Sequence, residues 1–281
     1  MRATVGTGAR GVERHDGTWC THHTQMASPT PLLQKLAATR LGVDLSAAIA
    51  ARARATLIDA QNLPRQGGAL LVGNHALGGV DAFALTALLI VHTGRVPRFL
   101  GERNLWRIPG ISALLDAAGA IPGIPDDAVR LLENGELVCV YPGGVDDSFK
   151  LTHEAYTLKW GSRAGFARVA MRAGVPILPV PATGVDELFS VNRREHLIGR
   201  WFGGSERYDI PIPESLVPRP VPLDYHLLEA IDTRGDPGDE AAVERVRAAT
   251  VSALESVLGP YRERARKANA SGYLGPREVP R

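Results

Sequence analysis

Short apolar runs alternate with amphipathic segments along the middle of the chain. Residues 81–93 and 162–174 follow helical spacing, and PDDAVRLLENG (125–135) has the proline start and glycine end of a complete helix. Continuous apolar runs of strand length lie at 69–73 (ALLVG), 96–101 (VPRFLG), 137–141 (LVCVY) and 175–182 (VPILPVPA). Strands that alternate with helices predict a single α/β domain with a mostly parallel central sheet flanked by helices.

The flanks of this alternating region are predicted to be helical or irregular. A short helix that begins near residue 29 is expected to end at Gly42, and an alanine-rich helix to follow over about 44–59. Past Gly184 no period dominates until a final helix, which Gly259-Pro260 is expected to stop. The spacing that predicts this helix is that of Val243, Val246, Thr250, Leu254 and Val257. We therefore divide the chain into a mobile arm (1–28), N-terminal helices (29–66), the α/β domain (67–259) and a basic tail (260–281).

Composition narrows the classes of function. The chain has 281 residues and a formal net charge of +2, whereas nucleic-acid binders usually carry a pronounced basic excess. The longest apolar run, AFALTALLIV (82–91), is shorter than the roughly 20 residues that a membrane-spanning helix needs. Two cysteines, Cys20 and Cys139, predict no disulfide framework, and the N-terminus lacks the apolar core of a secretory signal. We expect a cytoplasmic protein that does not bind nucleic acid.

Two patterns in the N-terminal arm resemble cofactor sites, and neither has the required context. GTGARG (6–11) matches the dinucleotide fingerprint, but no strand precedes it and no helical period follows. Four potential metal ligands lie in a polar, glycine-containing stretch that predicts no fold to hold them, namely His15, Cys20, His22 and His23. We interpret both as parts of a solvated arm and expect neither a metal nor a bound cofactor.

The stretch VGNHALGGVD (72–81) carries the first candidate chemistry. Asn74 and His75 follow the strand at 69–73, and ligands of open α/β sheets bind at the carboxyl ends of strands. Asp81 falls in the first turn of the next helix, where a carboxylate also caps free N–H groups. Considered by itself, the stretch leaves two interpretations open: a catalytic His–Asp pair, or a helix cap beside an incidental histidine.

Two further blocks follow in order, VYPGGVDD (140–147) and GVPILPVPATG (174–184). Together with the Asn-His turn, they make the chain resemble the lysophospholipid and glycerolipid acyltransferase superfamily over about residues 65–212. The block that starts at Tyr141 resembles the monoacylglycerol and diacylglycerol acyltransferase-like branch. That likeness includes the residues Tyr156, Leu158, Trp160, Arg163, Gly165 and Phe166.

The resemblance implies direct transfer of an acyl group from acyl-CoA or acyl-carrier protein to a lipid hydroxyl. In this role His75 is the general base, and Asp81 orients the imidazole and stabilises the imidazolium. No acyl-enzyme and no cofactor besides the donor thioester are implied. The residues implied to contact substrate are Asn74, Tyr141, Pro142, Gly143, Gly144 and Arg163.

The chain departs from the family pattern in two places. Five residues separate His75 from Asp81 where the family has four, and Gly78 and Gly79 are expected to absorb the extra residue. The second block, GAIPG, has no arginine, and Gly143 stands where the phosphoglycerol-using branch has a glutamate. We therefore expect a neutral acceptor such as mono- or diacylglycerol, because selection of a phosphate needs fixed cations.

Several alternatives remain open at this stage. A lysophosphatidate or lysophospholipid acyltransferase requires a cation from elsewhere, for which Arg163 is the candidate, and a non-catalytic lipid-binding protein with a degenerate site fits the altered spacing. A serine hydrolase lacks its Gly-x-Ser-x-Gly elbow. A basic run, Arg95, Arg98, Arg103 and Arg107, either meets the donor's phosphates or lies on a solvated helix face.

A lipid substrate and the absence of a spanning run predict peripheral membrane association. The apolar face formed by Leu32, Leu33 and Leu36 is expected to dock on a membrane surface, on the inner face of the membrane. The basic C-terminal tail is either solvated or attracted to anionic headgroups.

Overall fold

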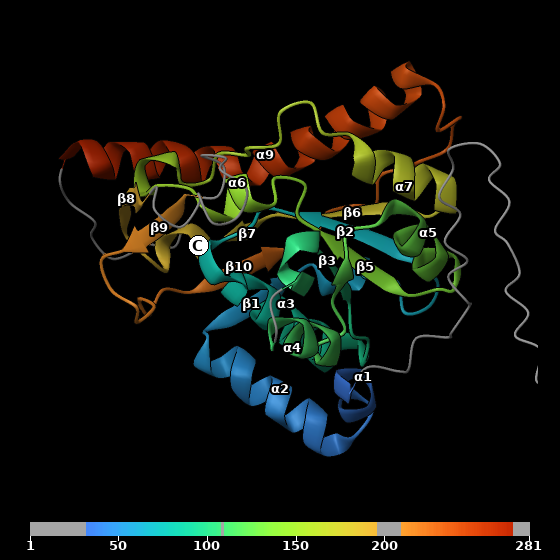
Figure 1. The fold of residues 1–281 in the computed structure, drawn as a ribbon, viewed down its shortest axis with the longest axis horizontal. Coiled ribbons are helices and arrows are strands. Elements are labelled where there is room, and N and C mark those ends of the chain that lie inside the picture. The colour runs from blue at the N-terminus through green and yellow to red at the C-terminus, as the bar shows by residue number, and fades with distance from the viewer. Residues whose placement is uncertain (1–31, 108–109, 196–208, 272–281) are drawn as a thin grey trace, which may run out of the picture. The chain divides into compact units, whose positions relative to one another are not determined.

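A five-stranded parallel sheet forms the centre of the structure, a computed structural model that describes residues 32–107, 110–195 and 209–271 (Figure 1). Its strands, in spatial order, are β4 (Ile121–Pro122), β3 (Arg98–Gly101), β5 (Leu137–Val140), β2 (Ala69–Gly73) and β6 (Ile177–Val180). All four neighbouring pairs are parallel, as predicted. The arm predicted for 1–28 and the end of the predicted tail, 272–281, lie outside the described residues.

Alternate residues of β2 bury their side chains in two different layers. Ala69 and Leu71 pack in the cluster that includes α3 (Val80–Thr93), while Leu70 and Val72 pack in the other cluster. That second cluster is completed by α5 (Pro125–Glu133), α7 (Gly165–Ala173) and α9 (Glu240–Ser271). A strand buried on both faces has no polar side, which explains the continuous apolar runs in the sequence.

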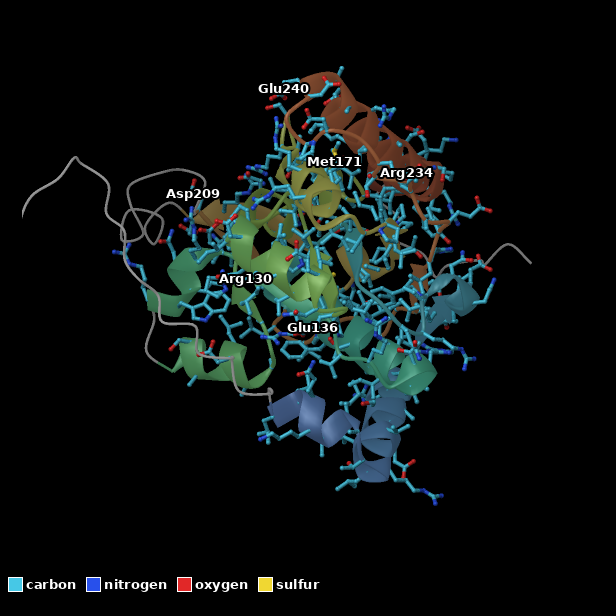
Figure 2. The ribbon with its side chains drawn as sticks, turned by 90° about the vertical axis from the view of Figure 1, so that its right-hand side faces the viewer. Arg130, Glu136, Met171, Asp209, Arg234 and Glu240 are labelled. Atoms are coloured by element: carbon cyan, nitrogen blue, oxygen red, sulfur yellow. The ribbon has the colours of Figure 1, made fainter. Side chains whose placement is uncertain are left out.

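Helices cover the sheet on both faces. In Figure 1, α9 lies at the top and α1 (Leu32–Ala37) and α2 (Arg40–Arg52) at the bottom. Met171 of α7 points into the layer beneath α9, whereas Glu240, the first residue of α9, lies on the outside (Figure 2) and pairs with Arg168. No helix within the described ranges combines the length and hydropathy that a membrane crossing requires.

A second, three-stranded sheet corrects the N-terminal prediction. The helix expected over 44–59 ends at Arg52, and residues 55–58 form β1 (Ala55–Ile58). β1 pairs in parallel with β10 (Leu223–His226), which also pairs with β7 (Ala182–Thr183) in the antiparallel sense. A four-residue strand whose partner lies far along the chain has no local period to reveal it. The segment 29–66 therefore contains a strand as well as helices.

Gly42 does not end the first helix. α1 ends at Ala37, and Gly42 lies inside α2, whose N-cap Thr39 accepts the Gly42 main-chain N–H through its side chain at 3.1 Å. A Cβ on Gly42 would lie 2.0 Å from the carbonyl oxygen of Leu36. The glycine is therefore required for the close approach of α1 to α2. In the sequence, a glycine with this packing role cannot be distinguished from one that ends a helix.

The last helix continues through the expected stop at Gly259-Pro260. α9 runs to Ser271 with Pro260 inside it, and the helix bends along its length (Figure 1). Contacts beyond the proline hold this second part: Tyr261 packs against Tyr156 with ring centroids 5.7 Å apart, and Arg262 donates to the Tyr156 carbonyl at 3.3 Å. Tertiary packing thus outweighs the local cost of proline, and the predicted tail is helical up to Ser271.

The remaining elements connect the layers. Two short helices follow β3, η3 (Arg103–Arg107) and α4 (Ile111–Ala117), and residues 108–109 lie outside the described ranges. Beyond Gly184, where no period was found, β8 (Val191–Glu195) and β9 (Ile210–Pro213) form a two-stranded antiparallel sheet. Four-residue α6 (Val145–Ser148) follows β5.

Candidate active site

His75 and Asp81 form a hydrogen-bonded pair at the carboxyl end of β2. His75 lies just beyond the strand, and Asp81 is the second residue of α3; the His75 Nδ1 and the Asp81 Oδ2 are 2.9 Å apart. The Asp81 side chain is fully buried, whereas that of His75 is 20% exposed. An imidazole that donates Nδ1–H to this carboxylate has its Nε2 lone pair available to accept a proton.

The turn between the two residues explains the extra residue in the spacing. Gly79, the last residue of the short helix η2 (Leu77–Gly79), has φ of +70°, a left-handed conformation that glycine adopts without strain. A Cβ at Gly79 would also come within 4.0 Å of the His75 ring. One of the two expected glycines therefore supplies the unusual backbone geometry, and the pair forms despite five intervening residues.

Charge and burial act on His75 in opposite directions. Burial lowers the pKa of His75, while the charge of Asp81, the hydrogen bond to it and the charge of Asp147 raise it, and the net pKa lies above 6.5. Tyr225 on β10 holds the main chain of Asp81, because its hydroxyl donates to the Asp81 carbonyl oxygen at 2.8 Å. The three-stranded sheet thus supports the carboxylate of the pair.

Asn74, expected to contact substrate, lies behind His75 and binds the backbone of Ala182. The side chain is fully buried, and its amide accepts from the Ala182 N–H at 2.8 Å and donates to the Ala182 carbonyl at 3.0 Å. Both polar ends of the amide are therefore bonded to one residue of β7. This reciprocal pair fixes the end of β2, and with it His75, to the neighbouring segment.

The Tyr-Pro-Gly-Gly turn lies beside His75. The Tyr141 ring stacks on the imidazole, with ring centroids 4.3 Å apart and an interplanar angle of 9°. Gly144 donates its N–H to the Tyr141 carbonyl at 2.9 Å and adopts φ of +53° with ψ of −133°, a region essentially restricted to glycine. Burial, with the nearby charge of Asp81, raises the pKa of Tyr141 well above 10.0, so the phenol stays neutral.

Arg163 holds this turn in place. Its guanidinium donates to the carbonyl oxygens of Gly143 at 2.9 Å, Lys159 at 3.2 Å and Pro142 at 3.3 Å, and it forms an ion pair with Asp146. A guanidinium engaged by three carbonyls and a carboxylate is a support of the Pro-Gly-Gly turn.

Two of the four arginines of the basic run are structural. Arg95 donates to the carbonyl oxygens of Pro64, Gly67 and Gly135, each at 2.7 Å. Arg98 is buried and binds the Gly119 carbonyl at 2.6 Å and Glu136 at 3.2 Å. Arg103 lines the cavity beside the turn, and Arg107 is exposed.

A cavity of about 310 Å³ opens beside the turn. Tyr141, whose ring stacks on the imidazole of His75, is one of the residues that line this cavity. Glu102, Arg103 and Arg163 contribute the charged part of the lining. The apolar part of the lining consists of Leu70, Leu100, Ile124, Val140, Phe166 and Val169. An apolar cavity with a few charged groups suits a lipid or acyl substrate.

Sequence reasoning missed Asp147. Its side chain is fully buried, and its Oδ2 accepts the main-chain N–H of His75 at 3.3 Å. Two consecutive aspartates in a polar stretch are typical of a solvated surface. Here Asp146 is half-buried in an ion pair with Arg163, and Asp147 is fully buried. The position of Asp147 in the sequence could have indicated its role. It follows the Pro-Gly-Gly turn after β5, and β5 is the neighbour of β2, which His75 follows.

Comparisons with known proteins match the segment that carries this site. The model of the family described as Acyltransferase matches residues 54–182. A Homo sapiens protein named "DGAT1/2-independent enzyme synthesizing storage lipids" is 30% identical over 201 residues, which cover 72% of this chain and 60% of that protein. A Bos taurus protein of the same name is 34% identical over 148 residues, 53% of this chain and 44% of its own length. The chain spans about half the length of the curated relatives it matches.

A solved structure also resembles this chain. The 1-acyl-sn-glycerophosphate (LPA) acyltransferase PlsC from Thermotoga maritima aligns with a TM-score of 0.47 and 16% sequence identity. The alignment covers 80% of this chain and 87% of the PlsC chain.

Proposed function

We propose that this chain, a member of the acyltransferase family through its residues 54–182, moves a fatty acyl group from a thioester to a neutral lipid hydroxyl. The donor is acyl-CoA or acyl-carrier protein, and the acceptor is a lipid such as mono- or diacylglycerol. The observation that carries the proposal is the pair itself: a buried Asp81 carboxylate 2.9 Å from Nδ1 of a partly exposed His75. A buried carboxylate that orients an accessible imidazole is the arrangement of a general base.

The reaction proceeds by direct attack of the acceptor. The Nε2 of His75 takes the proton of the acceptor hydroxyl as its oxygen bonds to the thioester carbonyl carbon. The tetrahedral intermediate then collapses, the carbon–sulfur bond breaks, and the thiolate takes the proton from the imidazolium. The products are an ester and a free thiol. Asp81 stabilises the imidazolium between the two proton transfers.

The engagement of the arginines supports a neutral acceptor. A site that selects a phosphate monoester needs several cations that face the ligand. Arg163, Arg95 and Arg98 bind main-chain carbonyls. Of the basic run, Arg103 alone lines the cavity. The names of the human and bovine relatives refer to storage-lipid synthesis, which agrees with an uncharged acceptor. The cavity beside Tyr141 supports the proposal further, because its apolar lining suits a hydrocarbon chain.

An exposed apolar face on α2 supports action at a membrane surface. Leu41, Leu45 and Ile49, spaced by four residues, are exposed large side chains on this helix. Leu32 is exposed as expected, but Leu33 packs against the buried cluster of Ala37, Ile90 and Val96 and Leu36 is half-buried. We therefore move the proposed docking face from α1 to α2. A helix with such a face binds the interface of a bilayer without spanning it.

The deciding experiment offers the purified protein an acyl-CoA together with diacylglycerol and lysophosphatidate at equal concentration. We expect ester formation that requires the acceptor and favours diacylglycerol, and its loss in His75→Ala. Thiol release that does not depend on an acceptor would identify a hydrolase. Binding of lipid with neither transfer nor hydrolysis would identify a carrier with a degenerate site.

A further inference from the structure

The carboxylate of Asp147 collects hydrogen-bond donors from two separate parts of the chain. Its Oδ2 accepts the main-chain N–H of His75 at 3.3 Å and the indole N–H of Trp160 at 3.4 Å. Its Oδ1 accepts the main-chain N–H of Lys159 at 3.1 Å and lies 3.6 Å from the Nζ of Lys150. The carboxylate therefore joins the histidine turn after β2 to the segment that follows the Pro-Gly-Gly turn.

The helix that carries Asp147 is fastened to the histidine turn a second time. The hydroxyl of Ser148 donates to the Ala76 carbonyl at 3.0 Å, next to the bond between Asp147 and His75. The first glycine of the turn, Gly143, makes room for this arrangement: a Cβ there would lie 2.3 Å from the Cβ and 2.6 Å from the Cγ of Asp147. A carboxylate thus lies against this turn after all, supplied by the residue four positions after Gly143.

Lys150 offsets the burial of the Asp147 charge. The ammonium is itself buried and lies 3.0 Å from the Oδ2 of Asp186. Asp186 in turn accepts the main-chain N–H of Tyr156 at 2.7 Å. A buried carboxylate needs such a cation and several N–H donors to remain charged. The network holds Asp147 through contacts other than its bond to His75.

We propose that Asp147 is a positioning residue for acyl transfer, which holds the His75 main chain and the Pro-Gly-Gly turn in one arrangement through a single buried carboxylate. The inference rests on the proposed role of His75 as the base. Asp81 orients the imidazole ring, and Asp147 fixes the backbone from which the ring projects. The two carboxylates therefore act on different parts of the same residue.

The charge of Asp147 gives this role a measurable signature. The groups that face His75 are Asp81 from α3, Tyr141 from the end of β5, and Asp147 and Lys150 from the segment around α6. Burial lowers the pKa of His75, the charges of Asp81 and Asp147 raise it, and that of Lys150 lowers it. Removal of the Asp147 charge therefore lowers the pKa of His75.

The test compares Asp147→Asn with Asp126→Asn, the same change at an exposed site on α5. For Asp147→Asn we expect kcat to fall by about 10- to 100-fold with little change in KM, because small displacements of a base cost on this order. The acid limb of its kcat–pH profile moves to lower pH. Asp147→Glu, which keeps the charge but displaces it, lowers kcat and leaves the acid limb in place. Asp126→Asn matches the unmodified protein in all three measurements.

A glycine variant provides an independent route to the same contact. Gly143→Ala displaces Asp147 by steric overlap, so its loss of kcat and that of Asp147→Asn are not multiplicative in the double variant. Gly259→Ala, where an added Cβ meets no atom closer than 3.9 Å, is the matched control. If the Asp147 variants do not fold, Gly143→Ala decides alone, and a normal kcat in that variant overturns the proposal.

His75→Ala separates the two levels of inference. An Asp147→Asn protein with a lowered melting temperature but unchanged kcat per folded molecule and an unchanged pH profile would show a purely structural role. If His75→Ala is inactive in that same experiment, the proposed function stands and only the role of Asp147 is refuted. If His75→Ala retains normal transfer, the proposed function itself fails.

Discussion

The imidazole of His75 lies nearly parallel to the ring of Tyr141, with ring centroids 4.3 Å apart and an interplanar angle of 9°. The stack limits rotation of the imidazole about the side-chain bonds of His75. The hydrogen bond to Asp81 fixes the ring edge that carries Nδ1 toward the buried carboxylate. Tyr141 therefore contacts His75 and is also one of the residues that line the cavity. Orientation of the base depends on both contacts.

Substitution of Tyr141 tests the stack. Tyr141→Phe keeps the ring and is expected to retain kcat within about threefold, whereas Tyr141→Ala frees the imidazole and is expected to lower kcat by about tenfold or more, since orientation of reacting groups carries much of the rate. Steady-state kinetics with a fixed acceptor measure both. Equal losses in the two variants would assign the effect to the hydroxyl instead of the stack.

The raised pKa of His75 predicts how activity depends on pH. Neutral imidazole is the active form in the proposed mechanism, so kcat/KM rises with pH through the pKa of His75 in the free protein, and the midpoint of this acid limb lies above 6.5. Asp81→Asn removes the largest influence that raises this pKa. We expect the variant to have a lower kcat and an acid limb shifted to lower pH. A profile that does not move would disconnect Asp81 from the base.

The same pKa has a consequence for stability. Because the pKa of His75 is higher in the folded protein than its ordinary value of 6.5, protonated His75 stabilises the fold below that pH, and this contribution is lost as pH rises through the folded-state pKa. We expect the difference in melting temperature between the unmodified protein and His75→Ala to narrow from about pH 6 to pH 8. A widening difference contradicts the sign of the shift.

Replacement of Asn74 is expected to affect stability through Ala182. Asn74→Ala leaves the buried N–H and carbonyl of Ala182 without their partners, which costs about 1–3 kcal/mol for such groups. Thermal or urea unfolding measures the loss. The matched control is Asn134→Ala at an exposed position, expected to lie within about 0.5 kcal/mol of the unmodified protein. Equal stability of the two variants would argue against the anchoring role.

Arg163 distinguishes the two acceptor classes. Its guanidinium holds the carbonyls of Pro142 and Gly143, so Arg163→Met is expected to lower transfer to diacylglycerol and to lysophosphatidate by the same factor. The ratio of the two kcat/KM values is the measurement. If the unmodified protein prefers lysophosphatidate and Arg163→Met loses this preference, Arg163 binds the phosphate. The neutral-acceptor proposal would then be wrong.

Exposed leucines of α2 are expected to bind lipid. The double variant Leu41→Asn, Leu45→Asn removes two large apolar side chains from the exposed face, and we expect it to reduce flotation with liposomes that contain anionic lipid. Ala248→Asn with Ser252→Asn places the same side chains at the same spacing on exposed α9 and serves as the control. Unchanged flotation of the α2 variant would exclude this face as the docking surface.

Local pattern was sufficient for four of the five strands of the parallel sheet and for the position of the His75–Asp81 pair. Strands β2, β5 and β6 have residues buried on both faces, so they are apolar and stand out in the sequence. The two-residue strand β4 is too short to show a pattern. The two residues of the pair are six positions apart, between the end of a strand and the start of a helix, so both members of the contact are visible in one short stretch. The same holds for the helix at 125–133, whose proline start and glycine end are local signals.

Only the tertiary structure decided which distant groups meet. Asn74 binds Ala182, 108 residues away, and Asp147 binds the main chain of His75 across 72 residues. β1 exists because β10 pairs with it, and α9 continues past Pro260 because Tyr261 packs against Tyr156. Pairing between buried polar groups and packing across the core depend on the register of separate segments, which no local period encodes. The sequence therefore placed the base and its carboxylate, and the fold determined what holds them.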